Sequence, residues 1–437
     1  MGFNFKSSVI VLFLVAVGIL PKATAQETWE KCGFVAAEAL LSADYPQEGT
    51  VGYFEEWIAE RIARQPELNY RSSMTIPVIV HVIYYGEKAG SGANIPYGQV
   101  LSQIEVLNED FNRMPNTNGY NNLDAGADIG ITFCPATIAP DGSILDEPGV
   151  DRVDGGQLKW TMDQIQATLK PKTYWDPARY LNIWTVYMGT SRRDNVIGYA
   201  QFPSASGLDG LNDNGGLAAT DGVVIDYRYF GSAEKGNFPN LVSPYDLGRV
   251  ATHEVGHWLG LRHIWGDGGC GADDYCDDTP GADGPNYDCA THVSCGSRDM
   301  VENYMDYTTD ACMNVFTQDQ KARVIAVLSD SPRRKELLNS DVCEIPVTKR
   351  IASTQVNVYP NPTPDAIQVE ISNPLEFETA PMYDLALYDP SGRQVLTATA
   401  TLGAANEVDL GALPAGLYIL RVSRADFSVH FKIIKAR

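Results

Sequence analysis

The spacing of apolar residues predicts a chain that mixes strands and helices over most of its length. A β-branched and aromatic run from Thr75 to Tyr85 predicts a strand, and apolar residues recur at helical spacing between Gly98 and Met114. Further strands are expected at 129–133, 181–187, 198–202 and 222–227, with loops rich in Asn, Asp and Gly between them. The pattern therefore predicts a mixed α/β or α+β domain, with a twisted mixed sheet backed by helices.

A second helix is expected after Ser243-Pro244, with Val250 and Ala251 on its buried face. Gly260 should end it, because glycine readily adopts the positive φ that turns the chain back. About forty residues rich in Gly, Asp and Cys follow, too polar and too interrupted for much regular structure, and a further helix is expected over 317–328.

The two ends of the chain differ from this middle part. Residues 26–72 are polar, with helical spacing of apolar residues over 54–63. From about Arg350 the chain changes to short alternating segments separated by turns, which predicts a small antiparallel sandwich of about seven strands. Two or three structural units are therefore expected in 437 residues.

Composition and the first residues indicate export. The formal net charge of −22 argues against a nucleic-acid partner. Lys6 precedes an apolar run from Val9 to Leu20 and small residues up to Ala25, which predicts an export signal over 1–25, too short for a membrane span. Eight cysteines in an exported chain predict disulfides and permit 105 full pairings.

The strongest chemical signal is the motif His253-Glu254-x-x-His257-x-x-Gly260-x-x-His263. On a helix, His253 and His257 project from one face and can share a tetrahedral metal, and a turn at Gly260 makes His263 a third ligand. The fourth position is left for a water that Zn²⁺ acidifies and Glu254 deprotonates. A core helix that merely contains histidines is the alternative, but this spacing should arise by chance in roughly one chain in tens of thousands.

Other candidate ligands carry weaker signals. Cys32 lies in the N-terminal segment, where a thiolate could occupy the water position and hold the site inactive; an incidental cysteine is the alternative. Acidic residues between 273 and 279 could bind a hard cation such as Ca²⁺ or form a solvated loop, since no twelve-residue calcium loop is present. His81, on an apolar strand, is expected to be a hydrogen-bonded core group.

The extended motif, followed by Asn303-Tyr304-Met305-Asp306-Tyr307, resembles the metzincin metallopeptidases. The short sequence segments around it resemble the pappalysin family. The resemblance spans roughly residues 76–338. It implies a metzincin catalytic domain with an irregular C-terminal part, zinc on the three histidines, Glu254 as general base and acid, and Met305 in a turn beneath the metal. It also implies that Tyr307 stabilises the oxyanion.

The resemblance extends to substrate binding and to the loop after His263. It implies that an extended substrate pairs with the edge strand Gly198-Tyr199-Ala200, and that Asp310 lines the first primed-side pocket and favours Arg or Lys there. It further implies calcium on Asp274, Asp278 and Thr279, a cysteine-switch role for Cys32-Gly33, and the disulfides Cys270-Cys295 and Cys289-Cys312. The partners of Cys134, Cys276 and Cys343 stay open.

The C-terminal segment resembles the sorting domain of type IX secretion, through Tyr359-Pro360-Asn361-Pro362 and Leu413-Pro414-Ala415-Gly416. We therefore expect a signal peptide at 1–25, a propeptide at 26–72, a zinc metallopeptidase domain at 73–345 and an immunoglobulin-like sorting domain at 352–437. The expected protein is a secreted or outer-membrane surface endopeptidase of a Gram-negative bacterium, acting on proteins or peptides. A non-catalytic adhesin on the same scaffold, and a C-terminal targeting module, are the alternatives.

Overall fold

The computed structural model describes residues 30–37, 39, 51–64, 74–188, 196–204, 217–344, 353–373, 382–424 and 427–436. The expected signal at 1–25 lies outside these ranges. Within the described part of the chain, no helix is long and apolar enough to cross a membrane.

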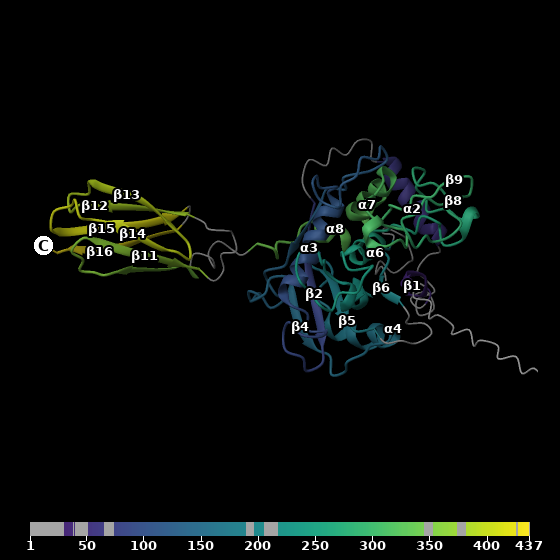
Figure 1. Ribbon diagram of the computed structural model, residues 1–437, viewed down its shortest axis with the longest axis horizontal. Coiled ribbons are helices and arrows are strands. Elements are labelled where there is room, and N and C mark those ends of the chain that lie inside the picture. The colour runs from purple at the N-terminus through teal and green to yellow at the C-terminus, as the bar shows by residue number, and fades with distance from the viewer. Residues whose placement is uncertain are drawn as a thin grey trace, which may run out of the picture.

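A seven-stranded mixed sheet forms the centre of the larger unit (Figure 1). The strand order is β1-β6-β7-β5-β2-β3, and β4 also pairs with β2. Only the β6–β7 pair is antiparallel among these pairings. The strands are β1 (Glu30–Cys32), β2 (Met74–Tyr84), β3 (Ile131–Pro135), β4 (Val150–Asp154), β5 (Leu181–Val186), β6 (Val196–Ala200) and β7 (Val223–Asp226).

Helices cover both faces of this sheet, as its alternating apolar residues require. On one face, Val78 and Val80 share a buried cluster with residues of α3 (Tyr97–Phe111) and α6 (Arg249–Trp258). On the other face, Trp184 and Val224 pack with residues of the short helices α4 (Met162–Gln164) and η1 (Ile165–Leu169), and the Trp184 indole donates to the Thr173 hydroxyl of α5 (Lys170–Thr173) at 2.9 Å. The expected strand at 75–85 and helix at 98–114 are therefore present.

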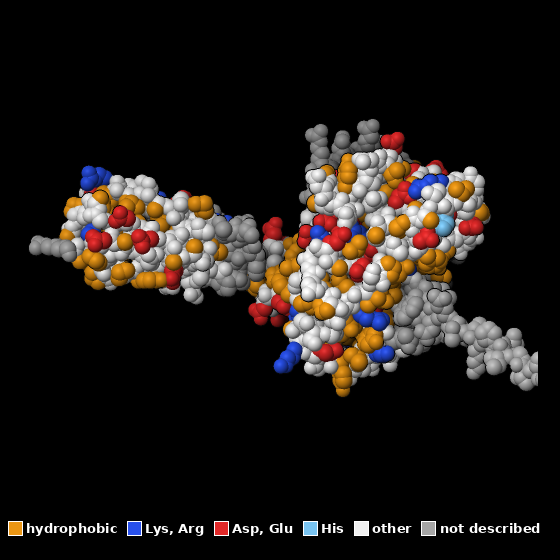
Figure 2. Space-filling model, viewed as in Figure 1, with side chains coloured by type: hydrophobic (Ala, Val, Ile, Leu, Met, Phe, Trp, Pro, Cys, Tyr) orange, Lys and Arg blue, Asp and Glu red, His pale blue; other side chains and the backbone are white. Residues whose placement is uncertain are grey.

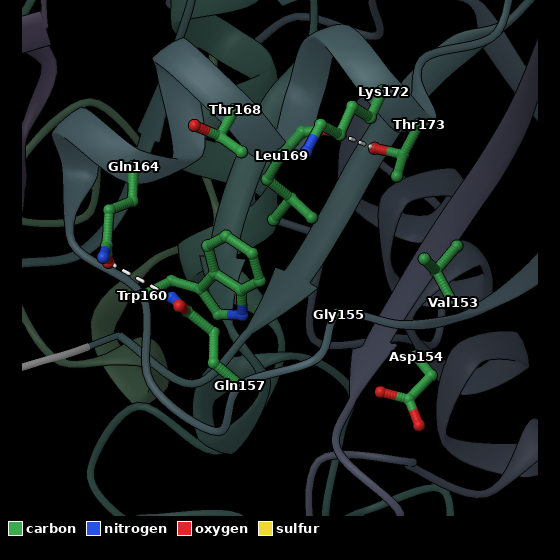
Figure 3. A pocket seen from close by; sticks show the side chains of 10 residues that line it. All are labelled: Val153, Asp154, Gly155, Gln157, Trp160, Gln164, Thr168, Leu169, Lys172 and Thr173. Atoms are coloured by element: carbon green, nitrogen blue, oxygen red, sulfur yellow. Dashed lines mark hydrogen bonds between the residues drawn. The ribbon is translucent and has the colours of Figure 1, made fainter.

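A pocket of about 420 Å³ lies beside the second group of helices (Figure 3). The indole of Trp160 and the side chain of Leu169 form its apolar part, and Asp154 and Lys172 are among its polar lining residues. None of the lining residues belongs to the histidine motif.

The chain after α6 is irregular, as its composition predicts. It contains short elements up to residue 312 and ends in two helices, of which α7 is capped at its N-terminus by Thr317. α2, at the N-terminal side of the chain, packs on α7 through Phe54, Trp57 and Ile58, which contact Val327. The elements not named above are α2 (Val51–Arg64), η2 (Ala218–Thr220), η3 (Tyr227–Tyr229), η4 (Gly269–Gly271), β8 (Val293–Ser294), β9 (Ser297–Arg298), η5 (Asp310–Cys312), α7 (Gln318–Asp330) and α8 (Arg334–Leu337).

The expected start of the motif helix at Ser243-Pro244 is wrong. α6 begins at Arg249, and its N-cap Gly248 has φ of 89°, a left-handed conformation that no helix interior contains. The expectation for His81 is confirmed, because its side chain is fully buried and its ring nitrogens lie 2.8 Å from Asp151 Oδ2 and 2.9 Å from Asn182 Oδ1.

The C-terminal segment contains a three-stranded and a four-stranded antiparallel sheet, in the orders β10-β11-β14 and β13-β12-β15-β16. One buried cluster draws residues from both sheets, such as Ile367 and Val369 from the first and Leu385 and Leu420 from the second. The immunoglobulin-like arrangement stays a prediction. The strands are β10 (Gln355–Tyr359), β11 (Ala366–Ser372), β12 (Met382–Tyr388), β13 (Gln394–Thr401), β14 (Ala405–Asp409), β15 (Gly416–Arg424) and β16 (Phe427–Lys435).

Charged side chains of both signs are dispersed over the visible face of the protein (Figure 2). Carboxylates, drawn in red, occur on the C-terminal strands as well as on the larger unit. The face that is shown contains no broad basic patch, apart from what the residues that are not described could add.

Candidate active site

The three histidines of the motif converge on one point. His253 and His257 lie four residues apart on α6, and His263 returns to them after the turn. The Nε2 atom of His257 lies 3.1 Å from the Nε2 atom of His253 and 3.1 Å from that of His263. All three side chains are fully buried.

A separate acceptor orients each imidazole through its other nitrogen. The Nδ1 atom of His253 lies 2.7 Å from the carbonyl oxygen of Tyr304, and that of His257 lies 2.8 Å from the carbonyl oxygen of Leu261. For His263 the acceptor is Asp267 Oδ1 at 2.5 Å. An acceptor at Nδ1 fixes the proton there and leaves Nε2 free to bind a metal.

The turn after α6 and the residue beneath it explain why the histidines can meet. Gly260 has φ of 91°, so it supplies the expected left-handed turn. Gly256 leaves room for Met305, since an added Cβ at Gly256 would lie 2.5 Å from the Met305 sulfur. The methionine thus lies directly against the helix between the first two histidines.

Cys32 completes the cluster from the N-terminal segment. One ligand atom from each of Cys32, His253, His257 and His263 lies within 4.8 Å of the other three. The Cys32 sulfur donates to Glu254 Oε2 at 3.4 Å and accepts from the Phe34 amide at 3.3 Å. The structure therefore brings the expected thiol to the expected site.

Burial sets the protonation of these groups. It raises the pKa of Glu254 to about 8, although the hydrogen bond from Cys32 and the charge of Lys31 oppose the rise. Burial also lowers the pKa values of His253 and His257 well below the usual range. Both imidazoles are therefore held neutral, as a metal ligand requires.

The donor set fits zinc. Three imidazoles and one thiol, with one ligand atom of each within 4.8 Å of the others, match the ligands that Zn²⁺ takes in tetrahedral sites. Orientation of each ring by a second acceptor, described above, is also typical of zinc sites. Within the described residues, this is the one group of His, Cys, Asp or Glu found to be spaced for a metal ion.

β1 covers the edge of the sheet at which a substrate strand is expected. It runs parallel to β6, with Cys32 opposite Gly198, and the Gly33 amide donates to the Gly198 carbonyl at 2.8 Å. The β6 residues Gly198, Tyr199 and Ala200 are buried; the Tyr199 side chain belongs to the cluster on the far face of the sheet. Such an edge therefore offers its backbone, and not the Tyr199 ring, to an extended chain.

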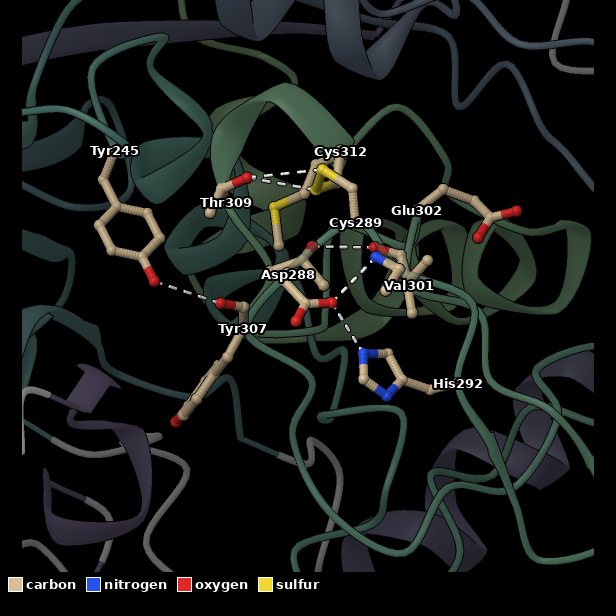
Figure 4. Close-up of a disulfide and its surroundings, with 12 residues drawn as sticks. Tyr245, Asp288, Cys289, His292, Val301, Glu302, Tyr307, Thr309 and Cys312 are labelled. Atoms are coloured by element: carbon tan, nitrogen blue, oxygen red, sulfur yellow. Dashed lines mark hydrogen bonds and ion pairs between the residues drawn. A yellow bond between two sulfur atoms is a disulfide. The ribbon is translucent and has the colours of Figure 1, made fainter.

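Tyr307 lies beside the histidines. Its ring centroid is 5.0 Å from that of His263, and its hydroxyl donates to the carbonyl oxygen of Cys32 at 3.1 Å. The Tyr245 hydroxyl donates to the Tyr307 carbonyl at 3.5 Å (Figure 4). A phenol that already donates to a carbonyl oxygen near the histidines is placed to donate to an oxyanion there.

Asp310 is buried, and its charge acts on the buried side chain of Lys31. Asp310 Oδ2 accepts from the amides of Leu247 and Arg249 at 2.9 and 3.1 Å, and its Oδ1 is buried without a hydrogen-bond partner. The Lys31 ammonium donates to the carbonyl oxygen of Thr308 at 2.9 Å. Burial lowers the pKa of Lys31 to about 8, and among the charges that oppose this fall Asp310 is the strongest.

Three disulfides are present in the described residues. Cys270 pairs with Cys295 and Cys289 with Cys312, the pairs that the resemblance implied, and the second lies beside Thr309 (Figure 4). Cys134 pairs with Cys343, which ties the end of the catalytic region to β3. Cys276, which had no assigned partner, is a buried free thiol.

The candidate calcium residues lie in the loop after His263, which the disulfides Cys270-Cys295 and Cys289-Cys312 cross-link. Both carboxylate oxygens of Asp274 lie within 2.8 Å of the Thr279 hydroxyl. Asp278 Oδ2 accepts from the Asp319 amide at 3.1 Å, and its Oδ1 is buried without a partner. Burial raises the pKa of Asp274 to about 7, which indicates a carboxylate with little positive charge around it.

Several residues of the site were not expected from the sequence. Phe34 stacks on His257 with ring centroids 4.2 Å apart, and Trp265 stacks on His263 at 4.3 Å. Lys31 belongs to no motif, and its position next to Cys32 is the available signal once Asp310 is assigned to a cation pocket.

Comparisons with known proteins agree with this geometry. Residues 164–329 match the M43 peptidase family, described as pregnancy-associated plasma protein-A, and residues 357–436 match the secretion system C-terminal sorting domain. An extracellular metalloprotease of Colletotrichum graminicola is 35% identical over 256 residues, which is 57% of this chain and 75% of the relative.

Solved structures are similar over more of the chain. A mutant promirolysin of Tannerella forsythia is 34% identical, covers 71% of this chain and 97% of its own, and gives a TM-score of 0.57. Mature mirolysin of the same organism, in complex with a cleaved peptide, is 37% identical, covers 63% of this chain and 99% of its own, and gives a TM-score of 0.52.

Proposed function

Because the chain belongs to the M43 (pappalysin) family of metalloendopeptidases and carries a type IX sorting domain, it is a secreted or cell-surface enzyme, and we propose three finer properties. It cleaves before Arg or Lys, it is kept latent by residues 26–72, and it uses zinc held by the three histidines. One observation carries the proposal: Cys32 lies beside the three histidines, while the neighbouring Lys31 is buried where the charge of Asp310 acts on it.

The basic preference follows from what the pocket accepts in this structure. It buries an ammonium near the Asp310 carboxylate, and the Tyr245 ring lies 5.4 Å from the Lys31 nitrogen. A buried carboxylate beside an aromatic face favours a cation and disfavours an apolar side chain. A substrate residue of the same charge can replace Lys31 after the prosegment is removed.

Latency follows from three contacts of the prosegment. β1 pairs with the edge strand, Cys32 lies within ligand distance of the histidines, and the Cys32 carbonyl accepts the Tyr307 hydroxyl. The strand edge, the open metal position and the oxyanion donor are thus all engaged at once. A substrate cannot bind until these residues leave.

In catalysis each side chain has a distinct part. Bound zinc would supply a Lewis acid that polarises the scissile carbonyl and lowers the pKa of a water. Glu254 takes the proton of the attacking water and returns it to the leaving amine. The Tyr307 hydroxyl donates to the carbonyl oxygen as negative charge develops on it.

We also infer a calcium ion at Asp274, Asp278 and Thr279. The unpartnered oxygen of Asp278 and the raised pKa of Asp274 both support a cation site at these residues. A chelator that removes calcium, with zinc kept saturating, should lower the melting temperature. An unchanged melting temperature at every free calcium concentration would remove this ion from the account.

Asp310→Asn tests the specificity directly. Asparagine keeps an oxygen acceptor for the Leu247 and Arg249 amides but removes the charge. In the matured enzyme, kcat/KM for a peptide with Arg after the scissile bond should fall by about ten- to a hundredfold, while the matching Gln peptide changes little. An unchanged Arg-to-Gln ratio would reject the pocket.

A further inference from the structure

A second buried charge cluster joins the prosegment to the catalytic domain. Glu55 of α2 is 6% exposed, and two buried arginines hold its carboxylate. Arg262 Nε donates to Glu55 Oε1 at 2.7 Å, and Arg323 donates from Nη1 to Oε2 at 2.6 Å and from Nη2 to Oε1 at 3.2 Å. The Arg323 pair is bidentate, the geometry in which arginine binds carboxylates most strongly.

Both arginines are fixed by contacts that do not involve the prosegment. Arg323 Nη2 also donates to the carbonyl oxygen of Gly260 at 3.0 Å. The guanidinium of Arg262 lies 4.8 Å from the centroid of the Phe202 ring. These contacts come from the catalytic domain itself, so we expect the two donors to keep their orientation when Glu55 leaves.

The cluster lies on the side of the histidines away from the Asp310 pocket. Phe34, two residues after Cys32, stacks on His257 and has its centroid 5.4 Å from that of Phe202, while Lys31, just before Cys32, donates to the Thr308 carbonyl and lies where the charge of Asp310 acts on it. Since Asp310 is assigned to the residue after the scissile bond, Phe202 and Arg262 face residues before it.

The cluster is within reach of a bound peptide. A chain of ring contacts links His257 to Arg262. The ring centroids of His257 and Phe34 are 4.2 Å apart and those of Phe34 and Phe202 are 5.4 Å apart, and the Arg262 guanidinium lies 4.8 Å from the Phe202 centroid. An extended chain advances about 3.3 Å per residue. A side chain roughly three or four residues before the scissile bond can therefore reach the arginines.

We propose that Arg262 and Arg323 form a substrate subsite in the matured enzyme that binds Asp or Glu three or four residues before the scissile bond. Glu55 fills this site in the zymogen as Lys31 fills the pocket of Asp310. Removal of α2 takes away the carboxylate that both guanidiniums bind and opens them to the substrate, so an acidic side chain of the substrate can take the place of Glu55. The inference rests on the proposed removal of residues 26–72.

The competing explanation is that a carboxylate of the enzyme takes the place of Glu55. Asp274 is one candidate, because the charge of Arg323 already acts on it. Arg262 and Arg323 would then have a structural role only, and peptides with an acidic residue would bind no more tightly than neutral ones.

Binding to the Glu254→Ala variant, freed of its prosegment by an added protease, tests the subsite without cleavage. Two peptides with Arg after the scissile bond are compared by calorimetry, one with Glu and one with Gln at the third and fourth preceding positions. The Glu peptide should bind about tenfold more tightly. Equal dissociation constants would overturn the proposal.

Variants identify the residues responsible. Arg262→Gln should reduce the Glu-to-Gln affinity ratio to about one, whereas Arg179→Gln, at an exposed ion pair with Asp341, should keep it. If Arg262→Gln does not fold, the ratio in the folded parent should still disappear at high salt. A ratio that salt does not change would also overturn the proposal. Cleavage of the Gln peptide by the wild type reports on the proposed activity separately.

Discussion

Replacing Asp221 with Asn removes a buried carboxylate that supports the end of the motif helix. Asp221 accepts from the indole of Trp258 at 3.0 Å and from both terminal nitrogens of Arg334 at 2.9 and 2.8 Å, and it pairs with Arg333. Arg334 also donates to the Trp258 carbonyl at 3.0 Å. His257 directly precedes Trp258, so the cluster positions a metal ligand.

The magnitude follows from the pKa and from the charges left behind. Burial alone would raise the pKa of Asp221, but Arg334 and Arg333 lower it from 3.8 to about 2, which corresponds to about 2 kcal/mol of stability at neutral pH. Asparagine also leaves the arginines buried without a counter-charge. The two effects together should lower the free energy of unfolding of Asp221→Asn by about 3–5 kcal/mol relative to the wild type.

The pH dependence has a defined sign. Because the pKa is lower in the folded state, the stabilisation is complete above about pH 4 and is lost as the pH falls toward 2. The wild type should therefore lose stability between about pH 4 and pH 2 as Asp221 is protonated. Asp221→Asn has no carboxylate at this position, so this contribution to the fall in stability should be absent from the variant.

Urea unfolding of the zymogen, followed by tryptophan fluorescence, measures both effects. Asp341→Asn is the matched control, because the Asp341 side chain is 86% exposed and its ion pair with Arg179 is at the surface. The control should lie within about 0.5 kcal/mol of the wild type. If Asp221→Asn is as stable as this control at pH 7, the buried cluster does not support the helix.

Two further predictions concern the site. Cys32→Ala should let the unprocessed chain cleave an Arg peptide slowly, because the loss of the thiol weakens the hold of the prosegment while β1 still competes with the substrate, whereas Cys276→Ala should leave it latent; latency in both would reject the thiol switch. Gly256→Ala should lower stability by about 1–3 kcal/mol, because the new Cβ would lie 2.5 Å from the Met305 sulfur. Gly284→Ala, with open space around its position, is the control, and equal melting temperatures would contradict the close packing.

The parts of the site that the sequence could predict are those set by local spacing. His253 and His257 share a helix face because they are four residues apart, and Gly260 supplies the turn that the third ligand needs. Strand β2 was predictable from a long β-branched run. In each case the decisive residues lie within about ten positions of one another.

The parts that could not be predicted depend on contacts between distant segments. Lys31 reaches its pocket because β1 pairs with β6, and Glu55 meets Arg323 across 268 positions of sequence. The start of α6 was misplaced because Gly248 is left-handed in the fold, although glycine alone does not dictate that conformation. β4 was missed because three of its five residues are charged.

The most direct test of the central claim compares the matured wild type with Glu254→Ala. Zinc content is measured by mass spectrometry of the metal, and kcat/KM is measured with an Arg-containing peptide. The variant should keep one zinc per chain, because the three histidines are unchanged, and should lose activity by about a thousandfold or more. Substantial turnover by the zinc-loaded variant would contradict the assignment of Glu254 as the base.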